Sequence, residues 1–175
     1  MKHTMNCVPV FVLVLVLANP ATIGAQVPQL FVTADRCMAC HNGLVTPSGE
    51  DVSIGVGWRG SMMANSARDP YWQAAVRRET MVHPTASAVI QNECSACHMP
   101  MMRFQANAEG HEGEIFKNLP LSNGDTLAAD VVSSYVCHKI QEEGLGERAS
   151  FTAGFYLETT TPEGERHLFC PNYNE

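Results

Sequence analysis

Two stretches of this chain combine cysteines and a histidine at a spacing that can attach haem. Residues 37–41 read CMACH and residues 94–98 read CSACH. In such a CxxCH motif, two thiols on one helical turn each add to a haem vinyl group, and the next imidazole binds the iron as proximal ligand. A metal or redox CxxC followed by an idle histidine is the competing interpretation, which two copies make weak. The attachment residues are predicted to be Cys37, Cys40, Cys94 and Cys97, with His41 and His98 as proximal ligands.

A third stretch lacks one cysteine of the motif. Residues 134–138 read SYVCH, with Ser134 at the position of the first cysteine. Three interpretations remain open. Cys137 holds a third haem through one thioether with His138 as proximal ligand, or the site has been lost, or Cys137 forms a disulfide with Cys170 in an oxidising compartment. The disulfide requires the two Cα atoms to lie within roughly 7 Å of each other.

The second axial ligand separates an electron carrier from an enzyme, because an iron with an open position can bind and transform a small molecule. Outside the motifs, the candidates are His83, His111 and, more weakly, His167. Three proximal and three further histidines would suit three bis-histidine haems, although surface histidines are an equal alternative. Met62 and Met63 are rival ligands for the first haem, where methionine would raise the reduction potential relative to histidine. Their competing role is core packing.

The elements that must position these residues are mainly helices with much loop, packed around covalent haems. Apolar residues recurring every three or four positions predict a helix over 71–82, begun by Asp69 and Pro70 and ended before Pro84. A second helix over 85–93 is expected to run into the second motif. A third is expected from Thr126 to the end of the SYVCH stretch.

The C-terminal part has a different pattern. Apolar side chains alternate over 151–157, a turn is expected over 160–164, and residues 166–169 can return as a partner strand. The sequence therefore predicts a small β-hairpin near the C-terminus.

The first 25 residues resemble an export signal. Lys2 precedes an apolar run over 8–18 that is too short to span a bilayer, and small residues lead to Ala25. We expect a signal peptide over 1–25 and one domain over 26–175, with a periplasmic or extracellular location and no membrane span after cleavage. An uncleaved anchor is the alternative. Covalent haem attachment in bacteria takes place outside the cytoplasmic membrane, so the two predictions agree.

Charge narrows the class of partner. The formal net charge is -7, and Lys2 is the one charged residue of 1–25, so the remaining chain is one unit more negative. An acidic protein is a poor match for nucleic acid or an anionic membrane surface. A basic or neutral redox protein is the expected partner. Oligomerisation or a place in a larger cytochrome assembly is compatible with this class.

Several segments resemble exported bacterial multihaem c-type cytochromes. They are the GEDVSIG stretch at 49–55, WRGSMMANSARDPYW at 58–72, the second motif with its continuation to Met101, CHKI at 137–140 and SFTAGF at 150–155. In such proteins the third motif usually has both cysteines and more motifs follow. Ser134 and the end of the chain soon after Cys170 depart from that pattern, so we expect a shortened relative or the N-terminal part of a longer cytochrome.

Two functions from different classes follow from these residues. The first is electron transfer through two or three covalently bound c-type haems. The alternative is a haem enzyme, or a subunit of one, acting on a small nitrogen, sulfur or peroxide substrate at an open haem position, with His83 or His111 as proton donor.

Overall fold

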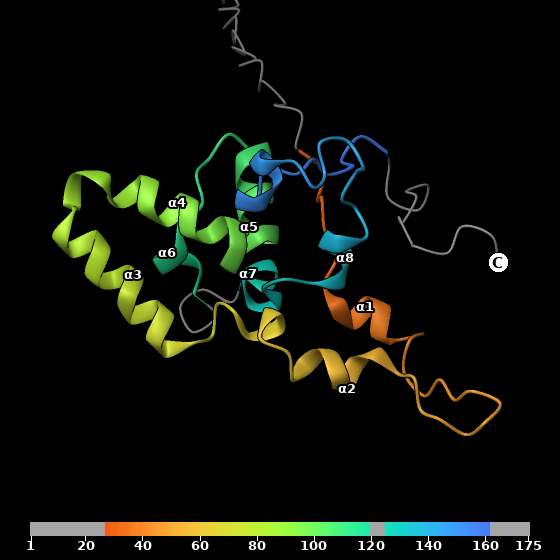
Figure 1. The fold of residues 1–175 in the computed structure, drawn as a ribbon. Coiled ribbons are helices and arrows are strands. Elements are labelled where there is room, and N and C mark those ends of the chain that lie inside the picture. Colours follow the sequence, from red (N-terminus) through yellow and green to blue (C-terminus); the bar gives the residue numbers. More distant parts are fainter. Residues whose placement is uncertain (1–26, 120–124, 162–175) are drawn as a thin grey trace, which may run out of the picture.

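A computed structural model describes residues 27–119 and 125–161, and these residues form a mainly helical fold with much loop (Figure 1). This confirms the helical class predicted from the sequence. The α-helices are α1 (Ala34–Met38), α2 (Ile54–Arg59), α3 (Pro70–Val82), α4 (Ser87–His98), α5 (Pro100–Ala108), α6 (Ile115–Asn118), α7 (Thr126–Asp130) and α8 (Ser134–Cys137). Short 3-10 helices are η1 (Met63–Asn65), η2 (Pro84–Ala86) and η3 (Arg148–Thr152).

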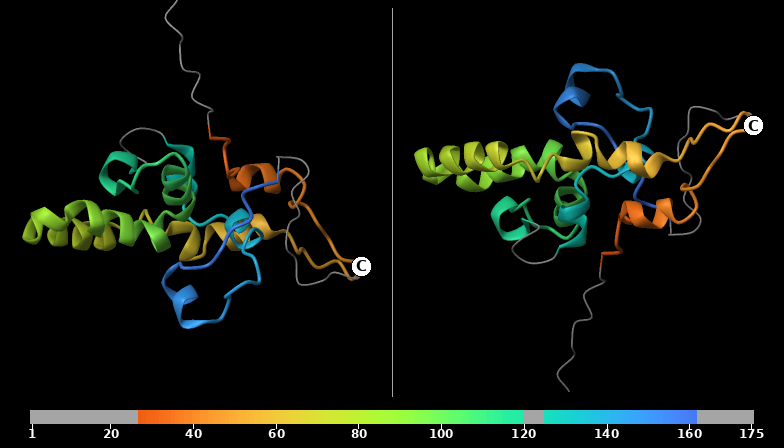
Figure 2. Two further views of the ribbon diagram at one scale, coloured as in Figure 1. Left: turned by 90° about the horizontal axis from the view of Figure 1, so that it is seen from above. Right: turned by 90° about the horizontal axis from the view of Figure 1, so that it is seen from below.

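Helices α3 and α4 form an antiparallel pair that extends as an arm from the rest of the fold (Figures 1 and 2). The Asp69 side chain accepts a hydrogen bond from the Tyr71 amide at 2.9 Å, and Pro70 occupies the first turn. Helix α3 ends at Val82, before Pro84. Both predicted helices are therefore confirmed, and α4 continues through the second CxxCH motif to His98.

The core lies where α4, α5, α7 and α8 meet the N-terminal segment. Phe31, Met99 and Met101 are fully buried there, together with Val136 of α8. Helix α5 was not predicted from the sequence. Pro100 opens this helix directly after α4, and the chain turns at Met99, so the methionines that follow the motif pack into the core.

The prediction of one helix from Thr126 to the third motif is wrong, because the segment forms two short helices with a break between them. Val131 has a φ of 61° and a fully buried side chain, which ends α7. Ser133 then starts α8 by accepting a hydrogen bond from the Tyr135 amide at 3.2 Å. Burial of Val131 and this new cap outweigh the helical periodicity of the segment.

Asp130, the last residue of α7, connects the break to the first motif. Its Oδ2 accepts a hydrogen bond from the Ala34 amide at 2.7 Å, at the start of α1. We expect Asp130→Ala to lower the free energy of unfolding by about 1–3 kcal/mol, because the Ala34 donor loses its partner. Asp130→Asn keeps an acceptor and should cost much less. Chemical denaturation of both variants measures the difference, and equal losses would contradict the role of this hydrogen bond.

The contribution of Asp130 to folding stability depends on pH in a defined direction. Burial raises the pKa of Asp130 above its ordinary value of 3.8, so ionisation of this carboxyl opposes folding. Wild type should lose stability as pH rises through that raised pKa, and Asp130→Asn should lack this loss.

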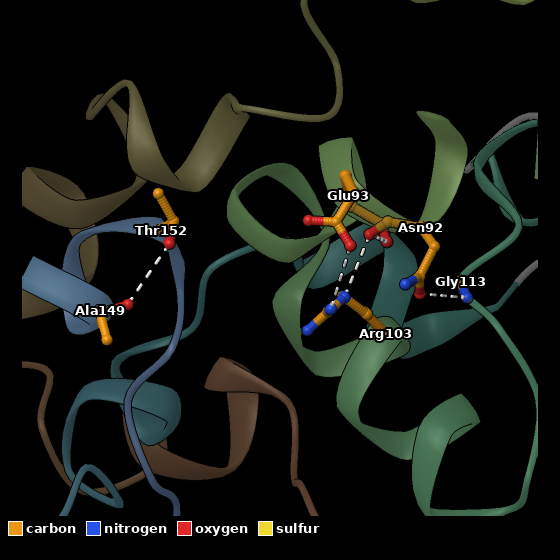
Figure 3. A network of polar contacts seen from close by, with 7 residues as sticks. Asn92, Glu93, Arg103, Gly113, Ala149 and Thr152 are labelled. Atoms are coloured by element: carbon orange, nitrogen blue, oxygen red, sulfur yellow. Dashed lines mark hydrogen bonds and ion pairs between the residues drawn. The ribbon is translucent and has the colours of Figure 1, made fainter. Parts of the chain in front are cut away.

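The predicted C-terminal hairpin is not formed by the described residues. Residues 148–152 make the 3-10 helix η3, in which the Thr152 hydroxyl donates to the Ala149 carbonyl at 3.3 Å (Figure 3). Gly154 allows the tight turn that follows, since a Cβ there would lie 2.3 Å from the Ala149 oxygen.

Leu157 instead forms an isolated antiparallel bridge with Ile140, next to the third motif. The other isolated bridge in the described part joins Val45 and Asp51. The return strand at 166–169 lies outside the described residues, as do the predicted signal peptide, His167 and Cys170. Within 27–119 and 125–161, no helix combines the length and the apolar composition needed to cross a lipid bilayer.

Candidate functional site

The second CxxCH motif occupies the last turn of α4, as the sequence predicted. Its spacers, Ser95 and Ala96, are buried in the core, with exposed fractions of 0% and 5%. The thiol-bearing residues lie on the outer side, where Cys94 is half-buried and Cys97 is exposed. Two cysteines on one turn are thus presented at the surface of the helix while the spacers anchor it.

The His98 ring is fixed in one orientation by residues that follow η1 and begin α3. Its Nδ1 lies 2.8 Å from the Ser66 carbonyl oxygen, and the ring stacks on Trp72 at 4.2 Å with an interplanar angle of 9°. The Ser66 hydroxyl also donates to the His98 carbonyl at 3.1 Å. A carbonyl oxygen only accepts, so Nδ1 carries a proton, and in the neutral ring the lone pair is on Nε2. This is the tautomer of a metal-ligating imidazole oriented by a backbone carbonyl.

A mainly apolar cavity of about 440 Å³ opens beside this ring. Its lining residues are Met62, Met63, Asn65, Ser66, Asp69, Cys97, His98 and Val132. The volume falls within the range of roughly 300–1,000 Å³ that is usual for ligand and cofactor sites. A cysteine and the adjacent oriented histidine therefore face one apolar space.

These features fit a covalently bound haem. The protein must supply two thiols on one turn, an imidazole with a free Nε2 and an apolar wall for the porphyrin. The α4 motif and its cavity provide all three. A c-type haem takes its proximal ligand from the motif itself. It therefore does not depend on a larger ligand cluster, and the described residues contain no group of three or more His, Cys, Asp or Glu side chains placed to hold a metal ion.

A polar network holds the end of α4 in place (Figure 3). The Asn92 side-chain oxygen accepts a hydrogen bond from the Gly113 amide at 2.9 Å. The Asn92 backbone carbonyl accepts one from Arg103 Nε at 3.1 Å. The Ser95 hydroxyl donates to the same carbonyl at 2.7 Å. The loop after α5 thereby packs directly on the spacer of the motif.

Gly113 is required at this contact. A Cβ at this position would lie 2.3 Å from Ser95 Oγ and 3.3 Å from Ser95 Cβ. We expect Gly113→Ala to lower the free energy of unfolding by about 1–3 kcal/mol through overpacking. The Ser95→Ala/Gly113→Ala double variant should recover part of the loss, because the closest atom is then gone.

Gly57→Ala is the matched control for thermal or chemical denaturation. A Cβ at Gly57, within α2, would meet nothing within 4 Å, so no loss is expected. A Gly113→Ala variant as stable as wild type would show that the loop does not hold the motif.

The third motif adjoins the second. A cavity of about 200 Å³ is lined by Ala96, Cys97, Pro100, Val132, Val136, Cys137, Ile140, Ser150, Phe151, Ala153 and Phe155. Cys97 and Val132 also line the cavity beside His98. The thiols of the second and third motifs therefore border one shared apolar region, on which Phe151 is 75% exposed.

Three of the motif thiols, those of Cys37, Cys94 and Cys137, have a raised pKa. Burial raises the pKa of Cys94 above its usual value, with smaller contributions from Cys97 and Glu93. Cys137 is exposed as a residue, but partial desolvation by the side chains around it raises the pKa of its thiol. Burial followed by Asp130 raises the pKa of Cys37. Redox-active CxxC pairs and catalytic cysteines have a lowered pKa instead. Attachment residues fit this environment better than thiolate chemistry.

The first motif is more exposed. Cys37 lies in α1 and is half-buried, whereas Cys40 and His41 are exposed. A cavity of about 380 Å³ includes Met38 of this motif, with Trp58, Arg59, Arg68 and Asp130, but neither its cysteines nor His41. The cysteines and the histidine of this motif therefore lie outside the neighbouring cavity.

The remaining candidate ligands are dispersed. His83 is exposed at the far end of α3, 3.9 Å from the Glu79 carboxylate. His111 is exposed and lines a cavity of about 230 Å³ that contains no CxxCH residue. Met62 and Met63, expected near the first haem, lie beside the second motif instead.

Comparison of the chain with protein-family models, with curated proteins and with solved structures finds no match.

Proposed function

We propose that this chain is an exported electron-transfer protein that carries c-type haems at its two CxxCH motifs. A third haem is attached to Cys137 by one thioether, with His138 as its proximal ligand. At each attachment point the sulfur adds to one carbon of a vinyl group and the thiol proton goes to the other. The resemblance to multihaem c-type cytochromes supports the same class.

The observation that carries the proposal is the state of His98. Its Nδ1 is committed to the Ser66 carbonyl, and none of its described contacts involves Nε2. His98 is half-buried, and every buried side-chain nitrogen in the described residues has a partner, so Nε2 is accessible from solvent. His98 and Cys97 line the same apolar cavity, so an imidazole with an accessible nitrogen and a thiol border one space.

Haem in these sites supplies a one-electron Fe(III)/Fe(II) couple. The chain's own residues set how that couple behaves. Trp72 and Ser66 hold the proximal imidazole in one orientation and one tautomer. Val132 and Cys97 line both the cavity beside the second motif and the cavity beside the third, and this proximity favours passage of electrons between the two sites.

The proposal includes a location and a partner. The N-terminal 25 residues direct export, and the protein acts in the periplasm or at the cell surface. Its acidic charge favours a neutral or basic redox protein as partner.

Optical spectroscopy of the protein from a strain competent in cytochrome maturation tests this function. We expect reversible one-electron oxidation and reduction, low-spin spectra in both states, and no reaction of the untreated protein with carbon monoxide. A high-spin haem that binds carbon monoxide or cyanide would instead favour an enzyme acting on a small molecule.

A further inference from the structure

We infer that the Met62–Met63 pair supplies the distal iron ligand of the haem held by Cys94, Cys97 and His98. This rests on the proposed function and assigns to it a ligand class, a thioether sulfur, for one particular site. From the sequence, these methionines were predicted as rival ligands for the first haem, and no distal ligand was assigned to the second.

Both methionines are exposed to solvent at the rim of the cavity beside His98. Met62 is 90% exposed and Met63 is 51% exposed, yet both line the apolar cavity that contains Cys97 and His98. Large apolar side chains gathered at such a cavity mark a surface that a ligand covers. A haem attached to α4 is the occupant that the adjoining thiol and imidazole specify.

The other polar side chains of this cavity already have partners. Asn65 donates to the Arg59 and Ser61 carbonyls at 2.9 Å each. Asp69 caps α3, and the Ser66 hydroxyl donates a hydrogen bond to the His98 carbonyl. Among the lining residues other than the motif itself, the methionine sulfurs are the iron ligands with no competing contact in the described part of the chain.

A histidine from α3 does not reach this site. His83 stands 11 residues after Trp72, whose ring stacks on His98, and a rise of 1.5 Å per residue places it about 16 Å further along the helix axis. His111 lines a separate cavity. The sequence suggested a second histidine as the distal ligand. For the second haem, this geometry favours another ligand.

Only one of the two sulfurs can bind. Met62 and Met63 are the cap and first residue of the 3-10 helix η1, where successive residues project about 120° apart, so when one side chain faces the iron its neighbour packs beside the porphyrin. A methionine ligand raises the potential relative to bis-histidine ligation, which would make this haem the preferred electron acceptor within the chain.

The test compares haem-loaded Met62→Leu, Met63→Leu and double variants with wild type. Leucine keeps the apolar volume and removes the sulfur. We expect the double variant to retain its haem mass but to lose the near-infrared charge-transfer band and the upfield methionine methyl resonance of a Met-ligated haem, and to show a lower potential at one haem. One single variant should reproduce this loss and the other should not, which assigns the ligand.

Met81→Leu is the control, because Met81 lies on α3, is 73% exposed and does not line the cavity. A double variant with full haem content and unchanged spectra would overturn the ligand assignment and leave the proposed function standing. A protein with no covalent haem in wild type would overturn both.

Discussion

The exported Cys94→Ala/Cys97→Ala variant should carry one haem fewer than wild type. Without either thiol, no covalent bond forms at the motif whose histidine is oriented by Ser66 and Trp72. The change appears as a loss of one haem in intact mass and as a fall in haem absorbance per protein, by about one third if the chain carries three haems. The exposed position of Cys97 and the half-buried position of Cys94 limit the direct cost of these substitutions to folding.

Cys94→Ser alone is the informative control. It converts the second motif to SSACH, the same pattern as the third motif, and should retain its haem through Cys97. A double variant with an unchanged haem mass would mean that haem is not attached at α4.

Cys137→Ser should also remove one haem. Cys137 is the one thiol of the third motif, and this exposed residue lines the cavity of about 200 Å³, so a serine is tolerated there but cannot form the thioether. Peptide mapping should show haem on the fragment containing residue 137 in wild type and none in the variant.

Ser134→Cys tests the same site in the opposite direction. Residue 134 opens α8 one turn before Cys137, so the substitution completes a CxxCH motif. The haem count should stay the same while the pyridine haemochrome spectrum shifts, because the third haem gains a second thioether. If Cys137→Ser leaves the haem mass unchanged and wild-type Cys137 is recovered in a disulfide with Cys170, the third site is a structural crosslink.

Local sequence signals predicted the arm that carries the second motif. Asp69, Pro70 and Pro84 define α3 by capping and by steric exclusion, which act within a few residues. The placement of the motif on the last turn of α4 follows from the same kind of signal. These features need no tertiary information.

Long-range packing decided what the sequence could not. The break at Val131 depends on burial of its side chain and on Asp130 bonding to a residue 96 positions away. Ser66 orients His98 through a backbone carbonyl, which any residue type would provide, so no sequence signal marks it. The position of Met62 and Met63 at the second motif likewise comes from the way the chain folds back after η1.

Intact mass of the mature exported protein, with peptide mapping of the haem-bearing fragments, tests the central proposal most directly. We expect the mass of three haems, on the fragments containing Cys37 and Cys40, Cys94 and Cys97, and Cys137. A protein with no covalent haem after expression in a maturation-competent strain would contradict it and would require another role for both CxxCH motifs.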